Sequence, residues 1–146
     1  RQDASADTAG SILVTRMAVR GCAGVVSGGG FRDAGGIGEL DMPAFYAGPS
    51  APTNLTKHAA IDINLPIGCG GVAVFPGDLL VGDRDGVMVI PAHLADEIAE
   101  VCAGMEAFED FVLEEVLAGT PIIGLYPCTK DENRKKFEAW REKTGR

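Results

Sequence analysis

Three consecutive glycines, Gly28–Gly30, constrain the fold most, because they separate a short apolar run from an adjacent cation and anion. The apolar run at residues 23–26 predicts a short buried strand that ends at the glycines. Arg32 and Asp33 follow one residue further on, and ligands of open α/β sheets gather at the carboxyl ends of the strands. The hexapeptide GGGFRD therefore indicates either a solvated surface turn or a small-anion pocket with a metal ligand beside it.

A helix is expected before this strand, over residues 8–20, with Gly21 as its stop signal. The apolar residues of its expected buried face recur at helical spacing: Ala9, Ile12, Leu13 and Met17. Ser11 lies near the start of this helix, where unpaired amides and a partial positive charge favour an anion. Ser11 is therefore expected either to help bind an anion or simply to cap the helix.

Short apolar runs after the glycines predict β structure. One strand is expected over residues 42–47, and antiparallel strands are expected over four later runs that Gly, Pro and Asp separate: residues 61–65, 72–75, 79–81 and 87–90. The turn at residues 83–86 joins the last two runs as a hairpin. Asp78, Asp83 and Asp85 lack the glutamate that ends a calcium-binding loop, so they are expected to be turn residues.

The C-terminal third of the chain is expected to be mainly helical. A long helix over residues 92–118, ended by Gly119, carries a narrow apolar stripe of the heptad kind. This stripe packs either across the chain's own sheet or on a neighbouring subunit. An extended apolar segment over residues 120–126 and a highly charged helix over residues 131–143 complete the chain.

Composition and charge exclude several classes of partner. The net charge is −8, and lysines and arginines do not cluster before the C-terminal tail, which argues against nucleic-acid binding. No apolar run approaches the ~20 residues of a membrane span, and the polar start at residues 1–10 lacks the pattern of a signal peptide. A cytoplasmic protein is therefore expected, and the lack of an initiator methionine indicates a fragment or a processed chain.

Cysteine and histidine patterns give little support for a metal site of their own. The four cysteines are far apart and form no CxxC pair, so a zinc site is poorly supported. Cys22 and Cys102 are expected to be small core residues. His58 and His93 are isolated in the sequence, which favours surface or capping roles.

Arg32 and Asp33 are the residues that best indicate chemistry. An arginine binds a carboxylate through two parallel hydrogen bonds, and an aspartate binds a hard cation such as Mg²⁺ through oxygen. Together they suit an α-keto acid, with the carboxylate on the arginine and the keto oxygen polarised by the metal. The sequence contains no nucleophile elbow, P-loop or dinucleotide fingerprint that would favour another chemistry.

Four segments together resemble the RraA-like family: GSIL at residues 10–13, RGCAGVVSGGGFRD at 20–33, PAFYAG at 43–48 and VFPGDLLVGDRDGVMVIP at 74–91. That family includes the 4-hydroxy-4-methyl-2-oxoglutarate / 4-carboxy-4-hydroxy-2-oxoadipate aldolases and the RraA regulators of ribonuclease E. The segment EDFVLEEVLAGTPIIGLYP at residues 109–127 is similar to the C-terminal helix and extension of the aldolase-type members.

The resemblance implies an α/β, RraA-like fold with a central β-sandwich or barrel-like core, flanking helices and a long C-terminal helix. It implies a single domain over residues 1–146 that lacks the family's N-terminal portion, with residues 92–146 as a helical C-terminal extension. It also implies a homotrimer or hexamer whose active sites lie at the subunit interfaces.

The activity implied by the resemblance is that of a divalent-metal-dependent aldolase, which cleaves a 4-hydroxy-2-oxo acid to pyruvate and a second oxo acid. By resemblance, Arg32 is the catalytic residue that binds the pyruvate carboxylate and keto oxygen, and Asp33 ligates Mg²⁺ or Mn²⁺. The segment Ser11, Ile12 and Leu13 completes the substrate site through backbone amides.

Acidic residues of the long helix complete the implied site from the neighbouring subunit. Glu109 or Glu106 best fits the position that holds metal-bound water in the family. Ser11 is a departure, because aldolase members usually carry an acid there, and serine supplies no negative charge. The resemblance therefore leaves two alternatives beside the aldolase: a protein-binding regulator of ribonuclease activity, and a diverged sugar-acid enzyme that uses the same enolate chemistry.

Overall fold

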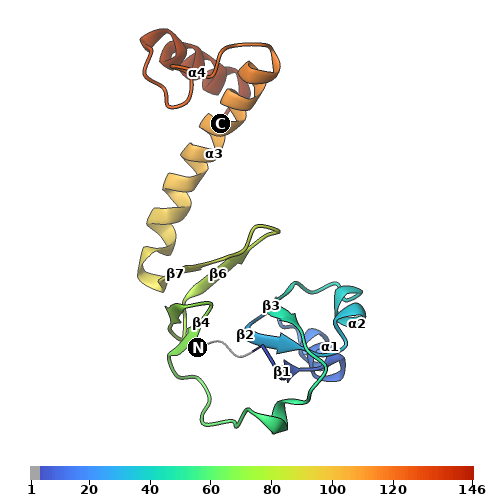
Figure 1. The fold of residues 1–146 in the computed structure, drawn as a ribbon. Helices are drawn as coiled ribbons and strands as arrows, with labels where there is room; N and C mark the ends of the chain where they lie inside the picture. The colour runs from blue at the N-terminus through green and yellow to red at the C-terminus, as the bar shows by residue number, and fades with distance from the viewer. Residues whose placement is uncertain (1–3) are drawn as a thin grey trace. The chain divides into compact units, whose positions relative to one another are not determined.

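The computed structural model describes residues 4–146, which form two compact units that meet in sequence between Ala92 and His93 (Figure 1). The N-terminal unit contains all the strands, and the C-terminal unit contains the two longest helices. Each unit has its own buried apolar cluster. The domain assignment, a single domain over residues 1–146 with a helical extension from residue 92, stays a prediction.

A parallel three-stranded sheet forms the centre of the N-terminal unit. The strands lie in the order β1-β2-β3, and both neighbouring pairs are parallel. A helix connects each strand to the next, giving the element order β1 (Asp7–Ala9), α1 (Ser11–Val19), β2 (Val25–Phe31), α2 (Ala34–Gly38) and β3 (Ala44–Pro49). Parallel strands bring their carboxyl ends to one edge of the sheet, so the residues that follow β1 and β2 become neighbours.

The predicted buried face of α1 is only partly correct: Met17, and Ala9 in β1, belong to the core cluster, whereas Ile12 and Leu13 do not. Val14 is fully buried and Met17 and Ala18 pack against the same cluster, whereas Ile12 is 87% exposed and Leu13 48% exposed. The predicted helix began too early, because residues 7–9 form strand β1. The set 14, 17 and 18 has the same helical spacing as the predicted set, so the sequence pattern alone did not distinguish the two faces.

The glycines lie inside strand β2 and do not end it, contrary to the prediction. A Cβ atom built on Gly29 would lie 2.5 Å from Thr8 Cγ2, and one on Gly30 would lie 2.5 Å from Ser50 Cβ. Only glycine permits such close approach of neighbouring strands. The glycines therefore carry β2 between its neighbours as far as Phe31, whose ring stacks on Tyr46 with 4.7 Å between the ring centroids.

Two antiparallel hairpins follow the parallel sheet. The second was predicted, whereas the first uses residues 67–69, which were not expected to form a strand. One pairs β4 (Ile67–Cys69) with β5 (Val72–Val74), and the other pairs β6 (Leu79–Gly82) with β7 (Val87–Ile90). Asp83 Oδ1 accepts hydrogen bonds from the amides of Asp85 and Gly86, which confirms a turn role. Before them lies a short 3-10 helix, η1 (Asn54–Thr56).

The predicted strand at residues 61–65 is wrong. Ile61 and Ile63 are 90% and 88% exposed, and Asn64 has a left-handed backbone with φ of 60°. A left-handed residue interrupts the extended conformation that a strand needs, and no sheet among residues 4–146 takes this run as a partner strand. Its apolar residues therefore belong to a connection between η1 and β4.

The C-terminal unit consists of two helices joined by turns. A 3-10 helix, η2 (Ala92–Leu94), leads into α3 (Ala95–Leu117), and α4 (Asp131–Thr144) follows, so both predicted helices are confirmed. The predicted extended segment at residues 120–126 is wrong, because it forms turns in which the Leu125 amide donates to Ile122 O. Leu125 is fully buried there, beside Phe111 and Val112.

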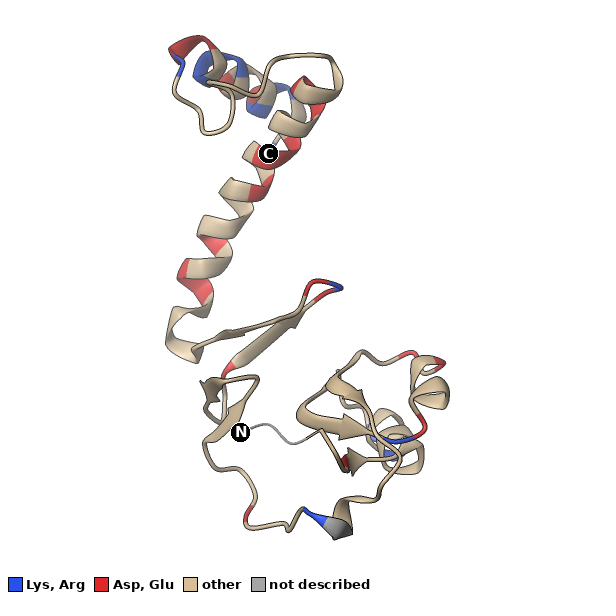
Figure 2. Cartoon of the chain, viewed as in Figure 1, with Lys and Arg blue, Asp and Glu red and all other residues tan. Residues whose placement is uncertain are grey.

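Opposite charges and aromatic rings join α3 to α4. Figure 2 shows acidic residues along α3 and basic residues on α4. Lys136 Nζ lies 3.6 Å from Glu115 Oε2, and Trp140 Nε1 donates to Glu114 Oε2 at 2.8 Å.

Within the apolar stripe of α3, Val112 is buried and Phe108 is half-buried. Val101, Met105 and Val116 remain 55%, 57% and 39% exposed. Packing of the stripe on a neighbouring subunit stays a prediction.

The α/β class with a long C-terminal helix is confirmed, while closure of the core into a barrel stays a prediction, because the strands of residues 4–146 form three separate sheets. The expectation that Cys22 and Cys102 are core residues is wrong: both thiols are free, and both residues are exposed. Within the described part of the chain, no helix combines the length and the apolar character that crossing a membrane requires.

Replacing Gly30 with alanine is expected to destabilise the N-terminal unit, because the new Cβ would lie 2.5 Å from Ser50 Cβ. Overpacking of this kind typically costs about 1–3 kcal/mol, which would lower the urea midpoint of unfolding. Gly35→Ala is the matched control, since nothing lies within 4 Å of its Cβ position. An equal loss in both variants would contradict the close-approach explanation.

Candidate active site at the carboxyl ends of two strands

Strands β1 and β2 deliver the predicted site residues to one edge of the sheet. Gly10 and Ser11 follow β1, and Arg32 and Asp33 follow β2. The Arg32 amide donates to Ala9 O at 3.0 Å, which holds the two strand ends together. The structure therefore places the start of helix α1 beside the Arg32–Asp33 pair, as the proposed pocket requires.

Ser11 holds Asp33 through two hydrogen bonds to one carboxylate oxygen. The Ser11 hydroxyl donates to Asp33 Oδ2 at 3.0 Å, and the Ser11 amide donates to the same oxygen at 3.4 Å. The N-cap of α1 is Gly10, without a side-chain capping bond, so Ser11 does not cap its own helix. The other carboxylate oxygen, Oδ1, takes part in neither bond.

Asp33 has a left-handed backbone with φ of 62° and ψ of 38°. Residues other than glycine adopt this conformation at a cost of about 1–2 kcal/mol, and such outliers gather at functional sites. Here the turn directs a half-exposed carboxylate toward α1 while the Asp33 carbonyl accepts from the Ile37 amide. The left-handed backbone of Asp33 therefore determines where its carboxylate lies.

Asp7 is a site residue that sequence reasoning missed. Its side chain is only 4% exposed, and its Oδ2 atom lies 3.7 Å from Arg32 Nε. Arg32 Nε also lies 3.8 Å from Asp33 Oδ2, so one guanidinium edge faces two carboxylates. A single acid in the polar segment before Gly10 gave no recognisable pattern, and only the pairing of β1 with β2 brings Asp7 to Arg32.

Gly10 opens the segment GSIL, but the sequence assigned it no role of its own. A Cβ atom at this position would lie 3.2 Å from an Arg32 Nη atom and 3.3 Å from Asp33 Oδ2. Both distances are tighter than ordinary van der Waals contacts. The absence of a side chain at Gly10 therefore leaves room for the charged groups to lie against the backbone.

A cavity of about 420 Å³ opens at this edge, a size typical of small-ligand sites. Its wall includes Gly10, Ile12, Leu13, Arg16, Arg32 and Asp33. The Val14 amide makes the first hydrogen bond of the helix, to Gly10 O, so the amides of Ile12 and Leu13 have no acceptor within α1. The partial positive charge of the helix start favours an anion in this cavity.

The residues of this cavity fit a magnesium-like ion better than a transition metal. Among residues 4–146, no three side chains of His, Cys, Asp or Glu are grouped as a metal site. Mg²⁺ keeps several waters and is often bound by one or two carboxylates together with its substrate. Asp33, with one carboxylate oxygen outside its bonds to Ser11, fits that kind of coordination.

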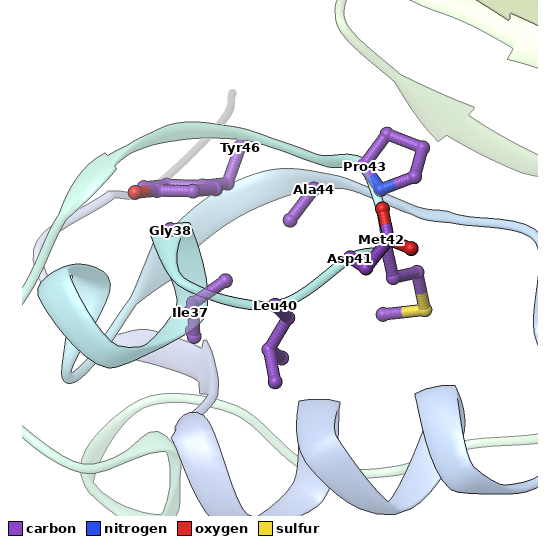
Figure 3. Close-up of a pocket in the computed structure, with 8 residues that line it drawn as sticks. All are labelled: Ile37, Gly38, Leu40, Asp41, Met42, Pro43, Ala44 and Tyr46. Atoms are coloured by element: carbon purple, nitrogen blue, oxygen red, sulfur yellow. The ribbon is translucent and has the colours of Figure 1, made fainter.

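Two further cavities of the N-terminal unit bring no such charges together. One of about 330 Å³ has walls of Ile37, Leu40, Met42 and Tyr46, with Asp41 as its charged residue (Figure 3). The other, about 670 Å³, lies between the parallel sheet and the hairpins and is lined mainly by apolar residues. Of these three cavities, only the one at the strand ends joins a cation, a carboxylate and a helix start.

Glu106 and Glu109 lie on α3 in the C-terminal unit, and their approach to another subunit's site stays a prediction. Tyr126 donates from its hydroxyl to Glu109 Oε1 at 3.0 Å. This hydrogen bond, together with the charge of Glu109, raises the pKa of Tyr126 above its usual range. This pairing was not expected, because residues 120–126 were predicted to be extended.

The fold and the cavity define the class of protein: an α/β protein with an arginine–aspartate site at the carboxyl ends of parallel strands. Residues 1–89 match the protein-family model described as "RraA-like: Aldolase/RraA". The chain belongs to the RraA-like family, which confirms the predicted fold family.

Relatives of the chain carry two kinds of name. It is 35% identical over 120 residues to a Halalkalibacterium halodurans protein named as a candidate 4-hydroxy-4-methyl-2-oxoglutarate aldolase, covering 80% of this chain and 57% of that protein. It also resembles the solved structure of Streptomyces coelicolor RraAS2, described as an unusual member of the RNase ES inhibitor RraA family. There the identity is 33% and the TM-score 0.64, over 75% of this chain and 56% of the other.

An uncharacterised protein from Pseudomonas syringae pv. tomato supports the fold alone, with a TM-score of 0.77 at 24% identity, over 83% of this chain and 60% of that one. The chain thus spans between about half and three fifths of the length of these relatives.

The ion pair between Asp7 and Arg32 is expected to show energetic coupling. In a double-mutant cycle of Asp7→Asn and Arg32→Met, we expect a coupling energy of about 1 kcal/mol, because Asp7 is buried while Arg32 remains partly exposed. Urea unfolding of the four proteins measures it. Asp41→Asn, an exposed acid, is the control and should show no coupling with Arg32→Met. Additive effects of the first pair would contradict the ion pair.

Glu109→Gln is expected to lower the pKa of Tyr126, because it removes the charge that disfavours the phenolate. The Tyr126–Glu109 hydrogen bond should persist below the ordinary pKa of tyrosine and be lost as the pH rises through the raised value. Ultraviolet difference titration measures this in a Tyr46→Phe background, which leaves one tyrosine. Glu97→Gln serves as the control on the same helix, and an unchanged Tyr126 titration in Glu109→Gln would disprove the pairing.

Proposed function

We propose that this chain provides the site of a divalent-metal-dependent aldolase that cleaves a 4-hydroxy-2-oxo acid to pyruvate and a second oxo acid. The observation that carries this proposal is the convergence of Arg32, Asp33 and the start of α1 on one cavity of about 420 Å³. The name of the Halalkalibacterium relative supports the same reaction class.

Arg32 and the helix start would bind the reacting end of the substrate. The guanidinium of Arg32 pairs with the substrate carboxylate and donates toward the keto oxygen. The unpaired amides of Ile12 and Leu13 donate to the same carboxylate. Because Asp7 and Asp33 both lie near Arg32 Nε, they orient the guanidinium before the substrate arrives, which reduces the entropic cost of binding.

Asp33 would hold Mg²⁺ or Mn²⁺ through its carboxylate, and such an ion, when bound, supplies Lewis-acid polarisation of the keto oxygen. Ser11 fixes the orientation of that carboxylate through its hydroxyl. In the cleavage step, the bond between C3 and C4 breaks and its electrons move to C3 and the C2 carbonyl, giving the enolate of pyruvate. Arg32 stabilises the negative charge on the enolate oxygen.

Two protons must move in this reaction. The C4 hydroxyl loses its proton as the second oxo acid forms, and C3 of the enolate gains one as pyruvate forms. Ser11 carries no charge and its hydroxyl already donates to Asp33, so it is not the base. We assign the base to an ordered water. Glu109 or Glu106 of a neighbouring subunit in a trimer or hexamer would hold this water. In such an oligomer, the exposed apolar residues of α3 would pack on that subunit.

A regulator of ribonuclease activity is the second candidate, and the likeness to Streptomyces RraAS2 favours it. A regulator of that kind would bind its partner through surface contacts and would need neither Arg32 nor Asp33. Arg32 variants therefore separate the two candidates. Substitution of Arg32 should remove the activity of an aldolase, whereas it should leave partner binding by a regulator unchanged.

The test is pyruvate release from 4-hydroxy-4-methyl-2-oxoglutarate by the purified chain with Mg²⁺, with Mn²⁺ and with EDTA. We expect activity with metal, none in EDTA, and a loss of about a hundredfold or more in kcat/KM for Arg32→Ala. Arg84→Ala, in the β6–β7 turn, is the control and should retain full activity. Full activity in EDTA would reject the metal, and full activity of Arg32→Ala would reject the site.

A further inference from the structure

Arg16 is a second cation in the wall of the cavity that contains Arg32. It lies on α1 one turn beyond Ile12, and residues four apart on a helix share a face. Ile12, Leu13 and Arg16 together form the side of α1 that lines the cavity, while Val14 and Met17 face the core. Arg16 thus extends the cavity along the helix, away from the strand ends.

No side chain in the described part of the chain pairs with the charge of Arg16. Its side chain is exposed and makes no hydrogen bond or ion pair with any of residues 4–146. Its neighbours at three and four positions along α1 include no acid, and Arg20, four residues on, repels it slightly. Arg16 lies in the last turn of α1, where its charge interacts favourably with the helix dipole. That role engages none of its side-chain donors, so the guanidinium remains available to a ligand in the cavity.

The charges of the cavity are distributed unevenly. Both carboxylates, Asp7 and Asp33, lie close to Arg32 Nε, so the charge of Arg32 is already compensated within the protein. Arg16 has no such compensation among the described residues. An anionic ligand with a single charge needs only the Arg32 end of the cavity, whereas a ligand with a second negative charge gains a further partner at Arg16.

We propose that Arg16 binds the second carboxylate of a dicarboxylic 2-oxo acid and is the residue that selects it over monocarboxylic analogues. The inference rests on the proposed function in one respect, namely that the first carboxylate binds Arg32. An arginine suits this task because its planar guanidinium makes two parallel hydrogen bonds to a carboxylate. The second carboxylate takes no part in bond cleavage, so Arg16 contributes to substrate affinity and not to the chemical step.

The experiment compares two substrates that differ in the second carboxylate: 4-hydroxy-4-methyl-2-oxoglutarate, with two, and 4-hydroxy-2-oxopentanoate, with one. For the first, Arg16→Gln should raise KM by about tenfold, since a hydrogen-bonded charge pair at an exposed position stabilises at the lower end of the usual range. Its kcat should stay within about twofold, because uniform binding affects KM alone. For the second substrate, both constants should be unchanged.

Arg20→Gln is the matched control, since it removes the same charge from the same helix outside the cavity wall. It should leave the preference between the two substrates intact. Arg16→Lys should recover part of the preference, because lysine keeps the charge and loses the bidentate geometry. An equal effect of Arg16→Gln on both substrates, or no effect on either, would overturn the proposal while leaving the aldolase assignment in place.

Calorimetric titration separates failure of this inference from failure of the proposed function. The wild-type chain and Arg16→Gln are titrated with 2-oxoglutarate, which has two carboxylates, and with 2-oxobutanoate, which has one. If neither hydroxy acid yields pyruvate but 2-oxoglutarate binds more tightly in an Arg16-dependent manner, the aldolase assignment fails and the role of Arg16 stands. If the wild-type chain shows no preference between the two acids, the role of Arg16 is rejected.

Discussion

The hydrogen bonds from Ser11 to Asp33 join the ends of two parallel strands, and the candidate site depends on that junction. One oxygen of Asp33 accepts both the hydroxyl and the amide of Ser11, so the start of α1 and the turn after β2 keep a fixed relation. Arg32 is held in the same place by the buried carboxylate of Asp7. A buried carboxylate such as that of Asp7 is tolerated only when it is paired. The Asp7–Arg32 ion pair and the Ser11–Asp33 hydrogen bonds therefore limit each other's geometry.

Membership of the RraA-like family identifies the fold, whereas the geometry of the site bears on the chemistry that the chain can perform. The family includes proteins named as candidate aldolases and proteins described as ribonuclease inhibitors, so the fold does not decide between them. The site is more informative, because a charged pair on a strained backbone, with a helix start beside it, has a chemical use that a purely protein-binding surface does not need. Ser11 keeps Asp33 in position through its hydroxyl, and because serine carries no charge, the proposed mechanism assigns the base to a water held by a neighbouring chain.

The sequence singled out Arg32 and Asp33, whose roles stay predictions, and it misplaced several of the elements around them. Arg32 and Asp33 were recognisable because a cation and an anion directly followed a glycine-rich strand, and helix α3 because its apolar stripe repeats over many turns. Asp7 was not recognisable, because only the pairing of β1 with β2, distant in sequence, brings it to Arg32. The buried face of α1 was partly misassigned because two sets of residues share the same period, and residues 61–65 were misassigned because an apolar run does not reveal the left-handed Asn64.

The close approach of β2 to its neighbours has a consequence for how this sheet changes in evolution. Because a methyl group at position 30 would lie only 2.5 Å from the Cβ atom of Ser50, the two positions compete for one small volume. A relative that enlarges position 30 without losing the side chain at position 50 must push β3 outward. Such a displacement would also reach Arg32 and Asp33, two and three residues along the same strand direction, so the interior of the sheet and the chemistry at its edge are not free to vary independently.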